Sequence, residues 1–128
     1  MLKFTEILDS LGLNVISLAD TIGTSEPEII KALYTSLTSE FTDTEFGVHL
    51  HSNPHQAREK IEAAYLAGCK RFDGAIMGFG GCPMAEEELV GNIPTEQILT
   101  VLHDFGEETG VDSMVFDKCL RKASQVFD

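Results

Sequence analysis

The sequence is short of cations, cysteines and prolines, and each shortage excludes a class of protein. Nine Lys and Arg stand against 21 Asp and Glu, which gives a net charge of −12. Because nucleic acids and anionic membranes are bound through basic faces, neither is expected as a partner. The three cysteines are an odd number and follow no secretory signal, which favours reduced thiols and a cytoplasmic protein. The four prolines and the lack of low-complexity tracts argue against disorder.

Long apolar runs are also missing. No stretch approaches the roughly 20 apolar residues that a membrane-spanning helix needs. The first residues lack the basic start and apolar core of a signal peptide. With 128 residues, of which 43% are hydrophobic, residues 1–128 are expected to form one domain at most, with an ordinary apolar interior.

Apolar spacing predicts an alternation of strands and helices. Helices are expected where apolar residues recur every three or four positions, and strands where short apolar runs lie between turn signals. The expected helices cover residues 4–11, 26–41, 54–67, 98–105 and 115–123, and the expected strands cover 14–19, 45–51 and 72–77. Ser25 and Glu28 match a capping box at the start of the second helix, and Ile29, Leu33, Leu37 and Phe41 form one apolar stripe behind it. The first and last helices carry apolar stripes as well.

The connections between the expected strands indicate a parallel sheet. No Asn-Gly turn joins neighbouring strands, and each connection is long enough to hold a helix. Polar and glycine-rich positions follow directly after each strand. In (β/α) barrels and in open α/β sheets, chemistry takes place at this carboxyl edge. Asp20, His49, His51 and Cys82 all fall there.

Two of these residues form a His-x-His pair at the end of the second expected strand, in the run Glu45-Phe46-Gly47-Val48-His49-Leu50-His51. Side chains two positions apart on a strand point to the same face. Imidazole is a common ligand of first-row divalent metals. On spacing alone, the pair indicates either two metal ligands or two hydrogen-bonded histidines that line a pocket. No Cys-x-x-Cys pair is present to support a Cys-His zinc site.

Three further polar residues have two interpretations each. Asp20 would bind metal or substrate, or cap the turn that follows its strand. Cys82 lies between Gly-Gly and Pro and would be either an accessible reactive thiol or an inert loop cysteine. Asn92 would offer a carbonyl oxygen to a hard cation or end a turn.

The remaining cysteines and histidines have simpler interpretations. Cys69 closes a helix and Cys119 sits on an apolar helical stripe, so both are expected to be structural. His55 and His103 lie on expected helical segments and are predicted to be surface residues.

Three motifs together resemble a known family. They are Asp20-Thr21-Ile22-Gly23, His49-Leu50-His51 and the glycine-rich run Gly78-Phe79-Gly80-Gly81-Cys82-Pro83. The chain resembles the C-terminal part of the 3-hydroxy-3-methylglutaryl-CoA lyases, which are metal-dependent (β/α)8 TIM barrels related to isopropylmalate and homocitrate synthases. The Gly-Gly-Cys-Pro run resembles the lyase signature around its catalytic cysteine, whereas the synthases carry a Gly-Glu-Arg-type sequence there.

The resemblance implies a role for each candidate residue. His49, His51 and Asn92 would hold a Mg²⁺ or Mn²⁺ ion, Cys82 would be the acid/base thiol, and Asp20 would lie in the substrate pocket. The implied reaction is the retro-Claisen cleavage of 3-hydroxy-3-methylglutaryl-CoA to acetyl-CoA and acetoacetate. The implied partner is therefore an acyl-CoA substrate.

The sequence departs from the family pattern in three places. Ser52-Asn53-Pro54-His55 follows the second histidine, where the family has an Asp-Thr-Tyr-Gly-like run. Residues 86–88 are all Glu, where typical members carry small residues. The family's N-terminal Arg-Asp pair, with its metal-binding aspartate, has no counterpart.

These departures define the expected fold and its alternatives. The expected fold is α/β: a partial (β/α)8 barrel with the last three parallel strands, flanking helices and additional C-terminal helices. We expect an N-terminally truncated lyase, poor or inactive by itself. Two alternatives are a non-catalytic piece that associates with an N-terminal half-barrel or with itself, and a lyase or synthase for a related acyl-CoA.

Overall fold

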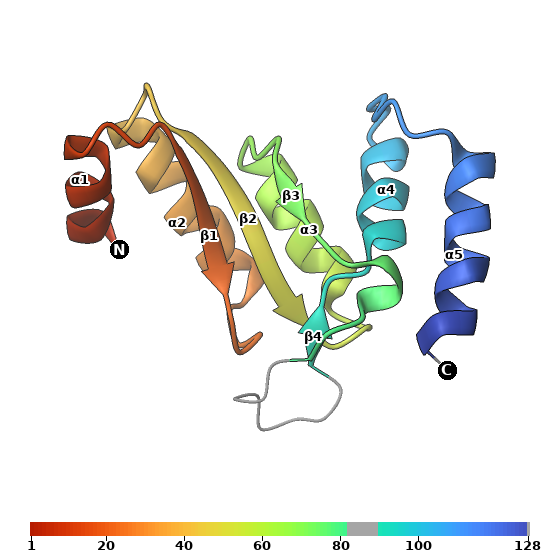
Figure 1. Ribbon diagram of the computed structural model, residues 1–128. Helices are drawn as coiled ribbons and strands as arrows, with labels where there is room; N and C mark the ends of the chain where they lie inside the picture. Colours follow the sequence, from red (N-terminus) through yellow and green to blue (C-terminus); the bar gives the residue numbers. More distant parts are fainter. Residues whose placement is uncertain (82–89, 128) are drawn as a thin grey trace.

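The computed structural model describes residues 1–81 and 90–127, and strands and helices alternate along them as predicted (Figure 1). In chain order the elements are α1 (Leu2–Ser10), β1 (Val15–Asp20), α2 (Pro27–Glu40), β2 (Glu45–Ser52), α3 (Ala57–Leu66), β3 (Phe72–Asp73), the 3₁₀ turn η1 (Ile76–Gly78), β4 (Gly91–Asn92), α4 (Thr95–Asp104) and α5 (Ser113–Phe127). The α/β class predicted from the sequence is confirmed.

The sheet is parallel where a parallel sheet was predicted. β1 pairs with β2 over residues 15–20 and 45–50, and β2 pairs with the short β3. β4 was not predicted. It pairs antiparallel with β2 and places Asn92 opposite His51. A strand of two residues is too short to produce the alternating apolar pattern by which strands are recognised in a sequence.

The third strand is shorter than its predicted range of 72–77. The ladder ends at Asp73, and the chain then turns through η1, where Met77 has a left-handed φ of 58°. Gly74 follows the ladder at a close approach of the backbone to α4. A Cβ atom there would lie 2.7 Å from Ile98 Cδ1 and 2.9 Å from the Ile93 carbonyl oxygen. The close approach therefore requires glycine at this position.

α2 and α3 lie against one face of the sheet and enclose the core, while no helix formed by residues 1–81 or 90–127 covers the opposite face (Figure 1). The Tyr34 hydroxyl on α2 donates to the Phe46 carbonyl oxygen on β2 at 2.8 Å. The apolar core consists mainly of Leu18, Ile30, Tyr34, Leu37, Phe46, Val48, Leu50, Ile61, Ile93, Ile98 and Val101.

The apolar stripe predicted for α2 is confirmed at Leu37, which is buried, and at Leu33 and Phe41, which pack against the core, but not at Ile29. Ile29 was expected on the buried stripe but is 59% exposed, whereas Ile30 and Tyr34 are buried. The predicted capping box is also wrong. The helix begins at Pro27 after the N-cap residue Glu26, and the Ser25 amide donates instead to the Asp20 carboxylate. Pro27 at the first helical position explains this start, because its missing N–H has no intrahelical partner there anyway.

The predicted stripes of the two terminal helices form but remain largely exposed. Phe4 and Leu11, on and after α1, are 72% and 71% exposed. α5 has no buried residue and meets η1 through the contact between Phe127 and Phe79. Within residues 1–81 and 90–127, no helix is long and apolar enough to span a membrane.

Candidate cation site at the carboxyl edge of the sheet

The two histidines of β2 converge on one point. His49 and His51 project from the same face of the strand, as their spacing predicts. Their Nε2 atoms lie 3.3 Å apart, and their ring centroids are 5.2 Å apart. His51 is 7% exposed, so its imidazole is largely withdrawn from water. Two ring nitrogens are therefore held together at the carboxyl edge of the parallel strands.

This geometry fits a divalent cation. An ion about 2.1 Å from each Nε2, a usual metal–imidazole distance, would subtend an angle of roughly 100° between them. Such an angle suits neighbouring ligands in tetrahedral or octahedral coordination. His51 Nδ1 is buried and has no hydrogen-bond partner among the described residues. The orientation of the His51 ring is therefore set by the contact of its Nε2 with His49 Nε2.

Asn92 faces this pair from β4. Residues directly opposite in an antiparallel ladder project to the same side, and Asn92 is opposite His51. Its Nδ2 donates to the carbonyl oxygens of Phe79 and Gly80, each at 2.9 Å. These bonds fix the amide plane and identify Oδ1 as the acceptor atom. In the described part of the chain, no group donates a hydrogen bond to Oδ1.

Asp20 ends β1 in a closed turn. Its carboxylate accepts hydrogen bonds from the backbone amides of Thr24 at 3.2 Å and Ser25 at 3.1 Å. It also forms an ion pair of 3.0 Å with Lys60, and Asp20 as a whole is 8% exposed. Of the roles considered for Asp20, turn capping is therefore the one seen here. Its place in a substrate pocket stays a prediction.

Lys60 was not predicted as a functional residue. It lies on the buried face of α3 and is only 2% exposed. Its Nζ donates to Asp20 Oδ2 at 3.0 Å, to the Gly23 carbonyl oxygen at 2.8 Å and to the His51 carbonyl oxygen at 3.0 Å. The sequence does carry a signal for this, since a lysine three residues after Ala57 falls on the same apolar helical face.

Two of the three cysteines, Cys69 and Cys119, fall within the described residues. Cys82, predicted as the acid/base thiol, lies outside the described residues. Cys69 is buried in the core, and this burial raises the pKa of its thiol, which agrees with a structural role. Cys119 is exposed on α5. Residues 1–81 and 90–127 contain no group of three or more His, Cys, Asp or Glu side chains that could hold a metal ion.

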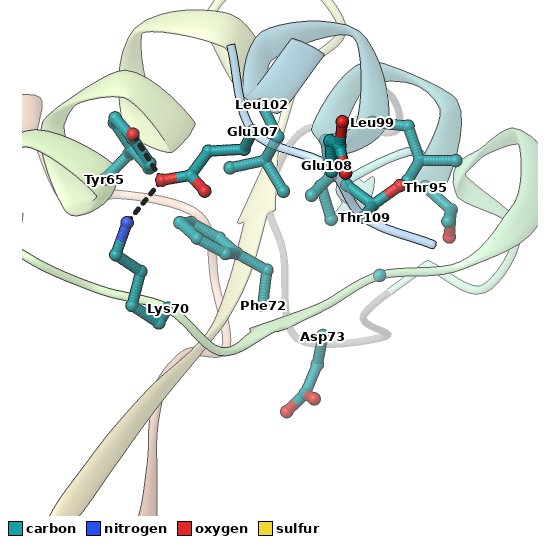
Figure 2. Close-up of a pocket in the computed structure, with 12 residues that line it drawn as sticks. Tyr65, Lys70, Phe72, Asp73, Thr95, Leu99, Leu102, Glu107, Glu108 and Thr109 are labelled. Carbon is teal, nitrogen blue, oxygen red and sulfur yellow. Dashed lines mark hydrogen bonds and ion pairs between the residues drawn. The ribbon is translucent and has the colours of Figure 1, made fainter. Parts of the chain in front are cut away.

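A hollow on the protein lies away from these donors. A cavity of about 530 Å³ opens between α3, β3, α4 and the segment that follows α4, as Figure 2 shows. At one end of it Glu107 accepts hydrogen bonds from Tyr65 and Lys70, which precedes β3. Asp20, His49, His51 and Asn92 do not line this cavity. The candidate site is thus defined by converging donor atoms rather than by the size of a hollow.

The parallel strands and the helices packed on one face of the sheet are the architecture of part of a (β/α) barrel. The chain belongs to the HMGL-like family, whose sequence model matches residues 1–125. The resemblance to the lyase family inferred from the sequence motifs is therefore confirmed.

Individual relatives support this assignment. The chain is 37% identical over 113 residues to the cytoplasmic 3-hydroxy-3-methylglutaryl-CoA lyase of Rattus norvegicus, covering 86% of this chain and 33% of that protein. It is 34% identical over 102 residues to the (R)-citramalyl-CoA lyase of Chloroflexus aurantiacus, covering 80% of this chain and 32% of that protein.

A solved structure agrees with the fold as well. The HMG-CoA lyase from Acinetobacter baumannii, in complex with coenzyme A and 3-methylmalate, superposes with a TM-score of 0.84 at 30% identity. The match covers 95% of this chain and 40% of that one. The chain spans about a third of the length of the curated relatives it matches.

Proposed function

We propose that the chain provides the cation-binding edge of a carbon–carbon lyase that cleaves 3-hydroxy-3-methylglutaryl-CoA to acetyl-CoA and acetoacetate. The observation that carries the proposal is the convergence of His49 and His51, whose Nε2 atoms are 3.3 Å apart, with Asn92 opposite His51. The relatives' names supply the reaction class, and the bound coenzyme A of the solved neighbour supports an acyl-CoA substrate.

The proposed ligands are the two Nε2 atoms and Asn92 Oδ1, and the proposed ion is Mg²⁺ or Mn²⁺. Imidazole nitrogen and amide oxygen together suit a divalent ion of this kind, with the remaining positions left to oxygen ligands. When bound, the cation supplies Lewis-acid stabilisation of the substrate's oxygen atoms. In the apo chain, the convergence of the ligands means that little reorganisation is needed to bind it.

The proposed chemistry requires one proton to leave and one to arrive. Transfer of the C3 hydroxyl proton to solvent water allows the C2–C3 bond to break, and the C3 oxygen becomes the ketone of acetoacetate. The electron pair of the broken bond passes to C2, which leaves as the enolate of acetyl-CoA. We propose that the Cys82 thiol delivers the proton that this enolate takes up. The Asp20 carboxylate, which accepts hydrogen bonds from two backbone amides, would help to line the substrate pocket.

Metal titration tests the site. We expect the purified chain to bind Mn²⁺, detected by loss of the free-ion electron paramagnetic resonance signal, and His51→Ala to weaken binding at least tenfold. His103→Ala is the matched control, because His103 lies exposed on α4 away from the donors. Equal binding by all three proteins would contradict the cation site.

A cleavage assay tests the reaction. The family's Arg-Asp pair has no counterpart among the 128 residues, so we expect slow release of acetoacetate with Mg²⁺ or Mn²⁺ present. The C82S variant should abolish whatever release occurs. Normal lyase turnover by the purified chain would contradict the need for the missing pair, and release that survives C82S would contradict the role of the thiol.

The second proposal is association, which the exposed edge of the sheet favours. Within the described residues β1 pairs only with β2, so one side of β1 presents unpaired backbone groups. α1 beside it exposes Phe4 and Ile7. A polypeptide that carries further strands, or a second copy of the chain, would cover this edge. Size-exclusion chromatography showing a monomer at all concentrations, alone and with candidate half-barrels, would contradict association.

A further inference from the structure

Lys60 links three backbone segments that meet at the candidate cation site. Its three ammonium hydrogens match three acceptors, which come from the end of β1, the turn after β1 and the end of β2. The side chain is 3% exposed and the Asp20 side chain that pairs with it is 7% exposed. The contact therefore lies in the interior, between the sheet and α3.

A buried ion pair is an unusual choice if stability alone is at issue. Removing two charges from water is costly, and well-packed apolar residues in their place are often as stable or more stable. The ammonium does what an apolar side chain cannot do: it fixes the directions of two carbonyl groups and one carboxylate at once. The arrangement therefore favours a role in local geometry.

The geometry that Lys60 fixes is that of a proposed ligand. The His51 carbonyl oxygen accepts from Lys60 on the helix side, and the same residue pairs with Asn92 on the β4 side. The His51 backbone is thus held at its own carbonyl group by Lys60, and on the β4 side through its neighbour Leu50, whose carbonyl oxygen accepts from the Ile93 amide at 3.3 Å. His51 Nδ1 has no partner among the described residues, so the side-chain contact of the ring there is the one between its Nε2 and the Nε2 of His49, and the backbone sets where the ring starts from.

We propose that Lys60 is a positioning residue for the candidate cation site, and that its link between the Asp20 turn and the His51 backbone makes the His49 and His51 imidazoles converge. The proposal rests on the proposed function only for the cation. The convergence of the two rings is a property of the chain itself and is testable without any metal.

The test compares Lys60→Met, the charge-balanced double variant Asp20→Asn/Lys60→Met, and two controls. The double variant removes the link without leaving an unpaired buried carboxylate, so it remains folded if the single variant does not. Ile61→Val is the first control, because it weakens packing at the next position of α3 but keeps the link. Lys70→Met is the second, because Lys70 is an exposed lysine paired with Glu107.

Two readouts apply to each variant. The first is the nuclear Overhauser cross-peak between the two imidazole rings in the metal-free protein, and the second is the Mn²⁺ dissociation constant. We expect the double variant to lose the cross-peak and to bind Mn²⁺ 10–100-fold more weakly, as is usual when a residue that orients a ligand is removed. Both controls should keep the cross-peak and remain within about twofold of the parent affinity, a margin worth roughly 0.4 kcal/mol.

The outcomes separate the two proposals. A folded double variant that keeps the cross-peak and the parent affinity overturns the role of Lys60. A parent chain that binds no Mn²⁺ overturns the cation site, while the cross-peak still decides whether Lys60 positions the rings. If Ile61→Val weakens Mn²⁺ binding as much as the double variant does, the effect of Lys60 is one of general stability and the positioning role is rejected.

Discussion

Two lysines of this chain each pair with one carboxylate, and their surroundings are opposite. The Lys60 side chain is 3% exposed and reaches Asp20 and two carbonyl oxygens. The Lys70 side chain is 67% exposed, pairs with Glu107 and lies 4.7 Å from the ring centroid of Tyr65. A lysine–carboxylate pair therefore contributes differently to stability at the two sites. In water, screening and side-chain entropy cancel most of the attraction, whereas in the interior an unpaired partner is very costly.

The largest change in the free energy of unfolding is expected for Lys60→Met. Because Asp20 would then be a buried carboxylate without its cation, we expect the free energy of unfolding to fall by about 3–5 kcal/mol. Adding Asp20→Asn should recover much of this loss. Urea unfolding of both variants measures it. A loss below about 1 kcal/mol for the single variant, typical of an exposed pair, would show that the interior position of Lys60 confers nothing special.

Two tyrosines extend the same comparison to neutral groups. Tyr34 is 4% exposed and donates to a strand carbonyl, and burial raises the pKa of its hydroxyl. Tyr34→Phe should lower the free energy of unfolding by about 1–2 kcal/mol, because the Phe46 carbonyl loses a buried donor. Tyr65→Phe, which removes a bond to the half-buried Glu107, whose carboxylate keeps Lys70 as a partner, should be nearly neutral. Equal effects of the two variants in thermal unfolding would contradict this distinction.

The smallest effect is expected at Lys70. Its hydrogen bond to Glu107 raises the pKa of the lysine and lowers the pKa of the carboxyl group, and both side chains remain in contact with water. A lowered carboxyl pKa gives stability that is present above the unfolded value of about 4.3 and is lost as pH falls through the folded value. Lys70→Met should therefore differ only slightly from the parent at pH 7, and the difference should disappear in acid and in high salt. A large difference in melting temperature at pH 7 would contradict this expectation.

Much of the fold could be predicted because its long elements carry strong periodic signals. β1, β2 and the five helices appear near their expected positions, and the absence of hairpin turns correctly indicated parallel strands. β4 escaped prediction because two residues carry no periodicity. The start of α2 was mispredicted because Ser25 and Glu28 match a capping box, whereas Pro27 begins the helix, and on its predicted apolar stripe only Ile29 is exposed.

The candidate site was predictable to a different extent. The His-x-His spacing correctly placed both imidazoles on one face. The position of Asn92 opposite His51 depends on β4, so only the family resemblance could suggest it. Lys60 was missed because a single lysine on an apolar helical face is usually an exposed residue at the margin of the stripe. Only the three-dimensional structure shows that its acceptors come from three separate segments.

The late position of β4 in the sequence also has a consequence for the order of folding. Positions 51 and 92 must come together before Asn92 can join His51, whereas β1 and β2 pair across the single helix α2. Longer loops are closed more slowly and at a greater entropic cost. We therefore expect the sheet of β1 and β2 with α2 and α3 to form first, with a bare histidine edge. Asn92 would join the two histidines afterwards, when β4 pairs with β2. A refolding chain would then regain its helical content before it regains the complete candidate site.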